Sequence, residues 1–267
     1  MNDNTTLTIE QNVANNHTTS VPKPRYYILD TIRGICIILV VLYHLLYDLS
    51  EVYGGNYVFF RSEGMNVFRD AFVGTLIFLS GISCNLSRSN VKRGVKTFLF
   101  GLVISVVMLV VMPSSKVYFG ILHFLGFSMM LYGLIGKLLE KIPAITGFLG
   151  FLLVHLLTYS VYEGYVGWPG LFMVDVPQVP RNLFFFILGF KTGHGAGDHW
   201  AIIPWLFIFL AGTYIGRYFK EERVPKWFSK NPIPPLSFIG SKTLIIYLVH
   251  QPLIYGALYL LNMGGVI

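Results

Sequence analysis

The sequence predicts an all-α fold, a polytopic transmembrane helical bundle of about seven spans and eight at most. Hydrophobic residues make up 54% of the 267 residues and charged residues only 12%, against roughly 25% charged residues in ordinary soluble domains. The mean hydropathy is +0.61, and long stretches contain no Asp, Glu, Lys or Arg. These values exclude a disordered chain, which has few apolar residues and a high net charge. They also argue against a soluble domain.

The spans follow from the length of the uncharged stretches, because a helix needs about 20 mostly apolar residues to cross the hydrocarbon core. The predicted spans are Gly34–Tyr47, Ala71–Ser87, Thr97–Ser115, Val117–Gly136, Ile142–Tyr162, Trp200–Gly216 and Thr243–Ile267. The first stretch is long enough only if Asp30 and Arg33 extend it at its start. Asn182–Phe190 is apolar but too short to cross, so we expect a re-entrant or interfacial segment there.

The remaining segments predict how the chain is organised. Residues 1–24 are polar and rich in Asn and Thr, and we expect them to form a disordered cytoplasmic tail. They contain no apolar stretch followed by a cleavage site, which excludes a cleaved signal peptide. Residues 25–267 are expected to form a single transmembrane domain. Two cysteines, Cys36 and Cys84, are too few for a disulfide scaffold.

The orientation follows from the excess of Lys and Arg on the cytoplasmic side of membrane proteins. If the N-terminus lies inside, the predicted inner segments hold 14 of the 20 basic residues and the outer segments hold five. The C-terminus then lies outside after seven spans. We expect a multi-pass protein of the plasma membrane in this orientation. The longest outer connection runs from Glu163 to His199 and contains the glycine-rich Gly193–Gly197.

Span one carries a polar stripe made of Asp30, Arg33, His44 and Asp48. At about 100° per residue, these four side chains fall within an arc of about 60° on the helix. Ionisable groups inside a membrane are costly and point to function. An alternative is that Asp30 and Arg33 only mark the inner interface and Asp48 the outer one. That alternative explains His44 less well, because His44 lies inside the span.

Several motifs resemble those of membrane acyltransferases. Leu29–Gly34, with ten residues between Arg33 and His44, is similar to the opening helix of the acyltransferase-3 family. The rest of the chain more closely resembles bacterial relatives of heparan-α-glucosaminide N-acetyltransferase. That second resemblance rests on the segments Phe78–Ser83, Phe119–His123, Ile203–Trp205 and Tyr247–Pro252. The matches occur in order from Arg25 to about Pro252 and so cover nearly the whole chain.

The resemblance implies an integral-membrane enzyme that moves an acetyl or short acyl group from cytoplasmic acyl-CoA. The acceptor would be an outer-facing sugar amine or hydroxyl, on a glycan or a lipid-linked sugar. Acetyl-CoA, or another acyl-CoA, is the implied co-substrate. The histidine spacing does not suggest a metal site, and no nucleic-acid partner is expected. The sequence leaves open the acceptor, the acyl length, N- or O-transfer, an acyl-histidine intermediate and a homo-oligomeric state.

The predicted catalytic residues are His44, Asp48 and His123. A neutral imidazole can take the proton of the attacking acceptor, and Asp48 at i+4 could orient the ring of His44. In the lysosomal member of the heparan-α-glucosaminide N-acetyltransferase family, an asparagine matches His44, and the catalytic histidine lies in the following loop. The corresponding segment here, Glu51–Asn66, contains no histidine. The role of His44 therefore follows the acyltransferase-3 pattern.

The other predicted site residues form three groups. Asp30, Arg33, His250 and Gln251 are expected to be structural or to position the donor. Arg88, Lys92, Arg93 and Arg217 lie where inner span ends meet, and they are candidates for binding the phosphates of CoA. Asp198 and His199 are candidates for the acceptor site.

Two other functions are compatible with the sequence. A polar stripe that contains histidine suits a proton-coupled small-molecule transporter, although no inverted repeat is visible. A non-catalytic membrane partner or assembly factor is the third alternative.

Overall fold

The computed structural model describes residues 24–55, 57–111, 116–194 and 198–265. Seven of its helices are long and apolar enough to cross a membrane, which confirms the predicted transmembrane bundle and its seven spans. They are α2 (Tyr27–Tyr47), α3 (Glu63–Leu86), α4 (Asn90–Val111), α5 (Ile121–Leu139), α6 (Ala144–Thr158), α8 (Ile202–Lys220) and α10 (Thr243–Met263). The tail predicted for residues 1–24 lies outside the described residues up to position 23, as do Gly195–Gly197 of the glycine-rich segment.

Three helices, α2, α3 and α4, begin earlier than the uncharged stretches predicted. Helix α2 begins at Tyr27, which places Asp30 and Arg33 in its first two turns. Helix α3 begins at Glu63 instead of Ala71, after Ser62, whose hydroxyl accepts a hydrogen bond from the backbone N–H of Met65 at 3.3 Å. Serine is a preferred residue at this capping position. Helix α4 begins at Asn90 instead of Thr97, so charged residues occupy the first turns of all three helices.

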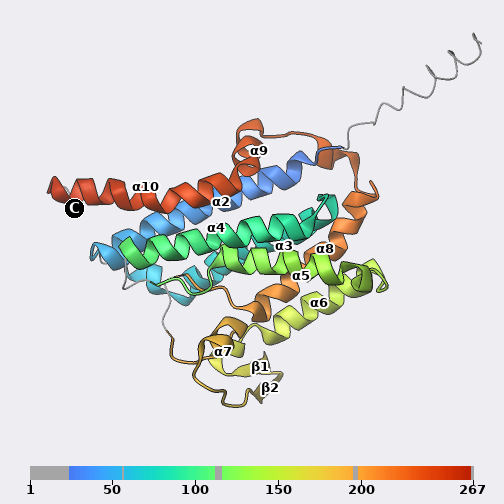
Figure 1. Cartoon of the computed structure of the whole chain (residues 1–267), viewed down its shortest axis with the longest axis horizontal. Helices are drawn as coiled ribbons and strands as arrows, with labels where there is room; N and C mark the ends of the chain where they lie inside the picture. Colours follow the sequence, from blue (N-terminus) through green and yellow to red (C-terminus); the bar gives the residue numbers. More distant parts are fainter. Residues whose placement is uncertain (1–23, 56, 112–115, 195–197, 266–267) are drawn as a thin grey trace, which may run out of the picture.

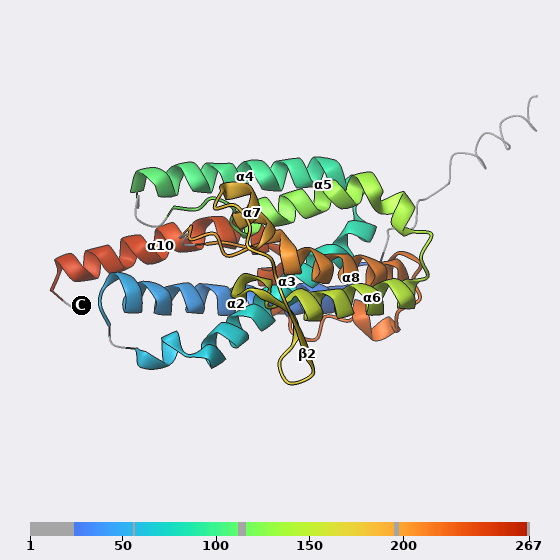
Figure 2. The same ribbon diagram turned by 90° about the horizontal axis from the view of Figure 1, so that it is seen from below.

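The spans pack in pairs, α3 along α8, α4 along α5, and α6 along α8. Figure 2 shows α4 and α5 on one side of the bundle and α2, α3, α6 and α8 on the other. Small residues allow the closest approaches: a Cβ atom on Gly81 would overlap the carbonyl of Phe209, and one on Gly212 would overlap that of Phe78. Such small residues are typical of helix contacts within membranes.

A short helix that the sequence did not reveal, α9 (Pro234–Ser241), lies between α8 and α10 in the chain and packs against the beginning of α2 (Figure 1). The contact joins two backbones directly. A Cβ atom on Gly34 would overlap the carbonyl oxygen of Leu236, and one on Gly240 would overlap that of Asp30. Helix α9 therefore fixes the end of α2 that carries Asp30 and Arg33.

The long connection between α6 and α8 is structured. It contains an antiparallel hairpin of β1 (Tyr165–Trp168) and β2 (Phe172–Asp175), in which Val166 pairs with Val174. The apolar segment Asn182–Phe190 forms the six-residue helix α7 (Leu183–Leu188), which is too short for an eighth span. The chain then passes beside the segment before α5, where the N–H of Trp200 donates to the carbonyl of Phe119 at 3.0 Å.

Candidate functional site

A cavity of about 1170 Å³ lies between the spans. It is lined by residues of α2, α3, α4, α5, α8 and α10, by the end of α6, and by the connection before α8. One face of α2 lines much of its length, through Arg33, Ile37, Val40, His44 and Tyr47. Their spacing of three or four residues is that of a single helix face. Two residues of the polar stripe, Arg33 and His44, therefore line an internal cavity, whereas Asp30 and Asp48 are not part of its lining.

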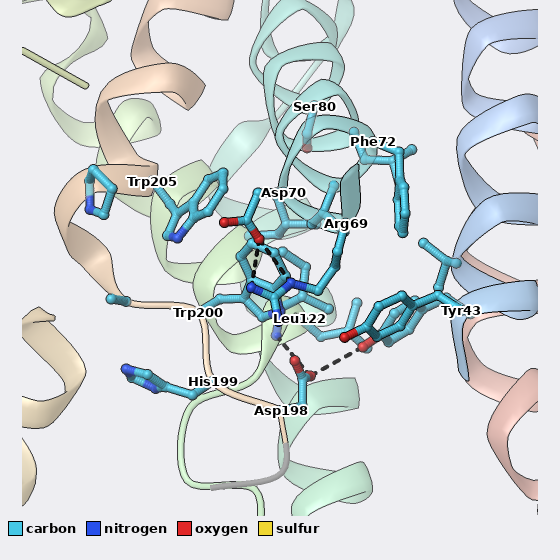
Figure 3. Close-up of a pocket in the computed structure, with 18 of the residues that line it drawn as sticks. Tyr43, Arg69, Asp70, Phe72, Ser80, Leu122, Asp198, His199, Trp200 and Trp205 are labelled. Atoms are coloured by element: carbon cyan, nitrogen blue, oxygen red, sulfur yellow. Dashed lines mark hydrogen bonds and ion pairs between the residues drawn. The ribbon is translucent and has the colours of Figure 1, made fainter. Parts of the chain in front are cut away.

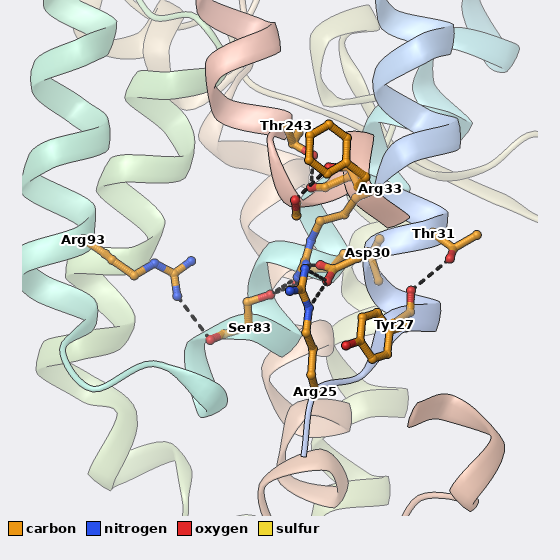
Figure 4. Close-up of polar contacts among 12 residues, drawn as sticks. Arg25, Tyr27, Asp30, Thr31, Arg33, Ser83, Arg93 and Thr243 are labelled. Atoms are coloured by element: carbon orange, nitrogen blue, oxygen red, sulfur yellow. Dashed lines mark hydrogen bonds and ion pairs between the residues drawn. The ribbon is translucent and has the colours of Figure 1, made fainter. Parts of the chain in front are cut away.

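The end of the cavity where α2 begins is lined by three cations, Arg33, Arg93 and Lys96, and we call it the cationic end. Arg33 donates to a carboxylate oxygen of Asp30 at 2.7 Å and to the hydroxyl of Ser83 (Figure 4). Arg93 donates to the backbone carbonyl of Ser83 at 3.2 Å. The two guanidinium groups are thus held by the same turn of α3.

Asp30 is buried between two guanidinium groups. Its other carboxylate oxygen accepts from Arg25 at 2.9 Å (Figure 4). The side chain of Arg33 is 21% exposed and that of Asp30 is 12% exposed. Since a buried charge requires a partner, Asp30 balances Arg33 and limits the direction in which its guanidinium points.

The opposite end of the cavity is lined by four carboxylates and one guanidinium, and we call it the acidic end. These residues are Glu63, Asp70, Glu163, Asp198 and Arg69. Arg69 donates to its neighbour Asp70 at 2.8 Å, and the hydroxyl of Tyr159 donates to the other oxygen of Asp70 at 2.6 Å. Figure 3 shows Arg69 between Asp70 and Asp198. Arg69 offsets the charge of one of the four carboxylates, and three carboxylates remain. The two ends of the cavity therefore have opposite charge.

Asp198 lies at the N-terminus of α5, where it accepts hydrogen bonds from the backbone N–H of Ile121 and the hydroxyl of Tyr247, both at 3.3 Å. Trp200 also hydrogen-bonds to it. Burial raises the pKa of Asp198, and these hydrogen bonds together with the charge of Arg69 act in the opposite direction. A helix N-terminus favours a negative charge, which explains why a buried carboxylate is tolerated here.

His199 lines the cavity beside Asp198. Its ring stacks on Phe186 of α7, with 3.8 Å between the ring centres. Burial lowers the pKa of His199 to about 4. A histidine with this pKa is neutral at physiological pH.

The middle of the cavity carries His44. Its ring lies against that of His250 in α10, with ring centres 4.9 Å apart. The next residue of α10, Gln251, donates to both carboxylate oxygens of Asp48 at 3.1 and 3.0 Å. The predicted residues of α2 and α10 therefore meet in pairs, His44 with His250 and Asp48 with Gln251.

Asp30, Asp48, His250 and Gln251 do not line the cavity themselves, and four further predicted site residues also lie outside the lining of the described chain. His123 packs beside Phe98 and Phe119, and its Nδ1 accepts from the backbone N–H of Gly120 at 3.3 Å. It thereby caps α5. Arg88 and Lys92 are exposed. The fourth is Arg217.

Arg217 binds the other end of α5. Its guanidinium donates to the carbonyls of Leu139 and Ile142 at 2.8 and 2.7 Å and lies over the ring of Tyr214. A cation is favourable where the last carbonyls of a helix have no helical partner. This geometry fits a structural role better than a contact with CoA.

Sequence reasoning missed Arg69, Asp70, Lys96 and Tyr159. Arg69 and Asp70 directly precede the apolar stretch Ala71–Ser87, so the search for uncharged stretches places them outside the span. Ser62, eight residues before Asp70, is the signal for an earlier start of helix α3.

Within the described part of the chain, no group of three or more His, Cys, Asp and Glu side chains could hold a metal ion.

Comparison with protein families identifies one match. The sequence model described as heparan-alpha-glucosaminide N-acetyltransferase, catalytic, matches residues 25–252. Comparisons with curated proteins and with solved structures gave no match. The matched range covers most of the chain and contains every residue that lines the cavity. The chain therefore belongs to the family of heparan-α-glucosaminide N-acetyltransferase catalytic domains, and it is a multi-pass membrane protein of the acetyltransferase type.

Proposed function

We propose that this protein transfers an acetyl or short acyl group from cytoplasmic acyl-CoA to an outer-facing sugar amine or hydroxyl at the plasma membrane. The observation that carries the proposal is the distribution of charge along one cavity. Three cations line one end, four carboxylates and Arg69 line the other, and His44 lies between them. Such a cavity suits two substrates of different charge that meet at a central base.

The cationic end fits the donor. CoA carries a pyrophosphate and a 3′-phosphate, and Arg and Lys side chains form strong charge-assisted hydrogen bonds to such groups. Arg93 and Lys96 lie one turn apart on α4, and both line the cavity. In the orientation that the basic residues favour, this end faces the cytoplasm, where acyl-CoA is available.

The acidic end fits the acceptor. Carboxylates attract a protonated amine and accept hydrogen bonds from sugar hydroxyls. Asp198 and His199 were expected to bind the acceptor, and both line this end of the cavity. Asp70, which is held by Arg69 and Tyr159, adds a third polar group there.

His44 is the proposed general base. As the acceptor nitrogen or oxygen attacks the thioester carbonyl carbon, its proton passes to His44, the carbon–sulfur bond breaks and the CoA thiolate leaves. Proton transfer by a positioned side chain typically contributes about 10²–10⁴-fold to a rate. Attack by His44 itself, with an acyl-histidine intermediate, would use the same position.

The test combines binding with turnover. Purified protein in detergent is incubated with radiolabelled acetyl-CoA and a panel of amino sugars and neutral sugars, and product formation is measured. Thermal stabilisation by acetyl-CoA reports donor binding separately. We expect stabilisation and transfer in the wild type. In His44→Asn we expect the same stabilisation, with kcat lower by about 10²–10⁴-fold.

Two outcomes would contradict parts of this proposal. If acetyl-CoA neither stabilises the protein nor labels any acceptor, the acyltransferase function is wrong. If His44→Asn keeps nearly full activity, the base lies elsewhere and His44 only orients a substrate.

A further inference from the structure

The two ring nitrogens of His250 have different surroundings. Nδ1 lies 2.7 Å from the backbone carbonyl oxygen of Tyr247. A carbonyl oxygen can only accept a hydrogen bond, so Nδ1 carries the proton. In the neutral ring Nε2 then has a free lone pair. His250 is 6% exposed, and its Nε2 is buried without a hydrogen-bond partner among the described residues.

The ring that faces His250 is that of His44. The ring centres are 4.9 Å apart, and the ring planes meet at 61°. This spacing is short enough for a hydrogen bond if two ring nitrogens point toward each other, and rotation of the His44 imidazole about its Cβ–Cγ bond leaves the bond from His250 to Tyr247 intact. His44 lines the cavity, whereas His250 lies behind it. The pair therefore has one ring that substrate can reach and one ring that is buried.

We propose that His250 is the positioning residue for His44. Its Nε2 accepts the N–H of His44 and so fixes one tautomer, in which the other nitrogen of His44 presents its lone pair to the cavity. The inference rests on the proposed acyl transfer. A base held by a third group in this way is a recurring arrangement in nucleophilic and acid–base catalysis.

The pair of His44 and His250 also explains where the acceptor's proton goes during acyl transfer. When His44 takes the acceptor's proton it becomes an imidazolium, and its original N–H still donates to the neutral His250. After the carbon–sulfur bond breaks, His44 returns that proton to the departing CoA thiolate and is neutral again. The proton on Nδ1 of His250 stays at the carbonyl of Tyr247 throughout.

Asp48 is a weaker candidate for this positioning role. It lies one turn after His44, but both its carboxylate oxygens accept from Gln251. The other titratable groups near the pair are Tyr43, whose ring centre is 6.0 Å from that of His44, and Tyr247. Tyr247 donates its hydroxyl to Asp198 and accepts from His250 through its carbonyl. A single residue of α10 thus connects the acidic end of the cavity to the proposed base.

The direct test is nuclear magnetic resonance of protein labelled with ¹⁵N in its histidine rings. Comparison with His44→Asn assigns the signals of His44. In the wild type we expect one neutral tautomer of His44, and in His250→Ala a mixture of both tautomers. In His250→Gln the side-chain carbonyl can accept the same N–H, so we expect a single tautomer again.

Kinetics provide the second readout. We expect His250→Ala to lower kcat by about 10–100-fold, as is typical for a group that orients another, and to leave KM for acetyl-CoA within about twofold. His250→Gln should recover most of this loss. His155→Gln is the matched control, because His155 is also buried and bonds a carbonyl, that of Pro204, at 3.1 Å. It should change neither the tautomer nor kcat.

The outcomes separate this inference from the proposed function. If the tautomer of His44 is the same in His250→Ala as in the wild type, the positioning role is wrong, whatever the activity. If His250→Ala raises KM for acetyl-CoA and leaves kcat unchanged, His250 positions the donor and the inference is also wrong. If the wild type transfers no acyl group, the proposed function fails, while the tautomer measurement still tests the histidine pair.

Discussion

Gln251 in the last span donates hydrogen bonds to both carboxylate oxygens of Asp48 in the first, at 3.1 and 3.0 Å, across 203 positions of the chain. Asp48 is 1% exposed and begins a π-helical turn, Asp48–Val52, that continues α2. The contact therefore joins the two helices that also carry His44 and His250.

Loss of this contact should destabilise the fold. In Gln251→Leu the buried carboxylate of Asp48 loses its donor, and a buried polar group without a partner costs about 1–3 kcal/mol. The change in unfolding free energy is measured by denaturant titration in detergent. The double variant Asp48→Leu/Gln251→Leu removes both partners and should be more stable than Gln251→Leu alone. Equal stability of Gln251→Leu and the wild type would show that the contact is not stabilising.

The cavity lining distinguishes among the basic residues of α4. Arg93→Gln and Lys96→Gln should each raise KM for acetyl-CoA by about 10-fold with little change in kcat, because they remove binding that is shared by the ground and transition states. Lys92→Gln is the matched control, because Lys92 belongs to the same helix and is exposed like Arg93 and Lys96, but does not line the cavity. Steady-state kinetics with varied donor provide the measurement. Equal effects of all three substitutions would indicate a general charge effect and no specific site.

The contact between α9 and α2 should not tolerate a side chain. In Gly240→Ala the new Cβ would meet the backbone carbonyl of Asp30, and overpacking of this kind costs about 1–3 kcal/mol. A lower thermal midpoint is therefore expected. Gly256→Ala in α10 is the control, since nothing lies within 4 Å of its added Cβ. A thermal midpoint of Gly240→Ala at or above that of Gly256→Ala would contradict the described packing.

The pH dependence of stability should show a contribution from His199. Burial lowers its pKa to about 4 in the folded protein, against about 6.5 in an unfolded chain. The unfolded chain therefore binds a proton first, and stability is lost as pH falls from about 6.5 to about 4. The pKa of Asp198 is raised in the folded protein, so its effect on stability has the opposite sign. The stabilisation that Asp198 provides at low pH is lost as pH rises.

The variant His199→Phe isolates this contribution. Phenylalanine keeps a ring against Phe186 and cannot take up a proton. Its thermal midpoint should fall less than that of the wild type between pH 6.5 and pH 4. Parallel curves for wild type and His199→Phe would show that His199 does not contribute.

Cysteine labelling tests the orientation. A cysteine at Ser89, between α3 and α4, should react with an impermeant maleimide only after cells are made permeable. A cysteine at Leu171, which is 79% exposed at the turn between β1 and β2, should react in intact cells. Cys36 and Cys84 are buried, which keeps the background low. The reverse pattern would place the cationic end outside and would remove its access to cytoplasmic acyl-CoA.

The sequence predicted the seven spans because hydrocarbon thickness sets a length that apolar stretches must reach. It placed Asp30, Arg33 and His44 on one face because helical spacing determines direction. It could not place the start of α3, because a search for uncharged stretches stops at Asp70. The charged first turns of α3 are compatible with the bundle because Arg69 and Asp70 pair with each other at the acidic end.

Partners from distant helices were beyond sequence reasoning. The sequence predicts a catalytic role for both His123 and His44. Their surroundings differ, because His123 caps its own helix whereas His44 faces the cavity and meets His250. Similarly, Arg217 binds the end of α5, a contact between residues more than 70 positions apart. Such contacts depend on which helices pack together, and span lengths do not specify this.

The three cations at the cationic end have a consequence for how the enzyme would respond to the metabolic state of the cell. On the proposed function, acyl-CoA and spent CoA carry the same phosphates, so Arg93 and Lys96 would hold both equally well. On the proposed function, discrimination must come from the acyl group itself, near the apolar Ile37 and Val40 of the lining. Free CoA would then be a strong product inhibitor. The rate at which acyl groups are transferred across the membrane would follow the ratio of acyl-CoA to CoA in the cytoplasm more closely than the concentration of acyl-CoA alone.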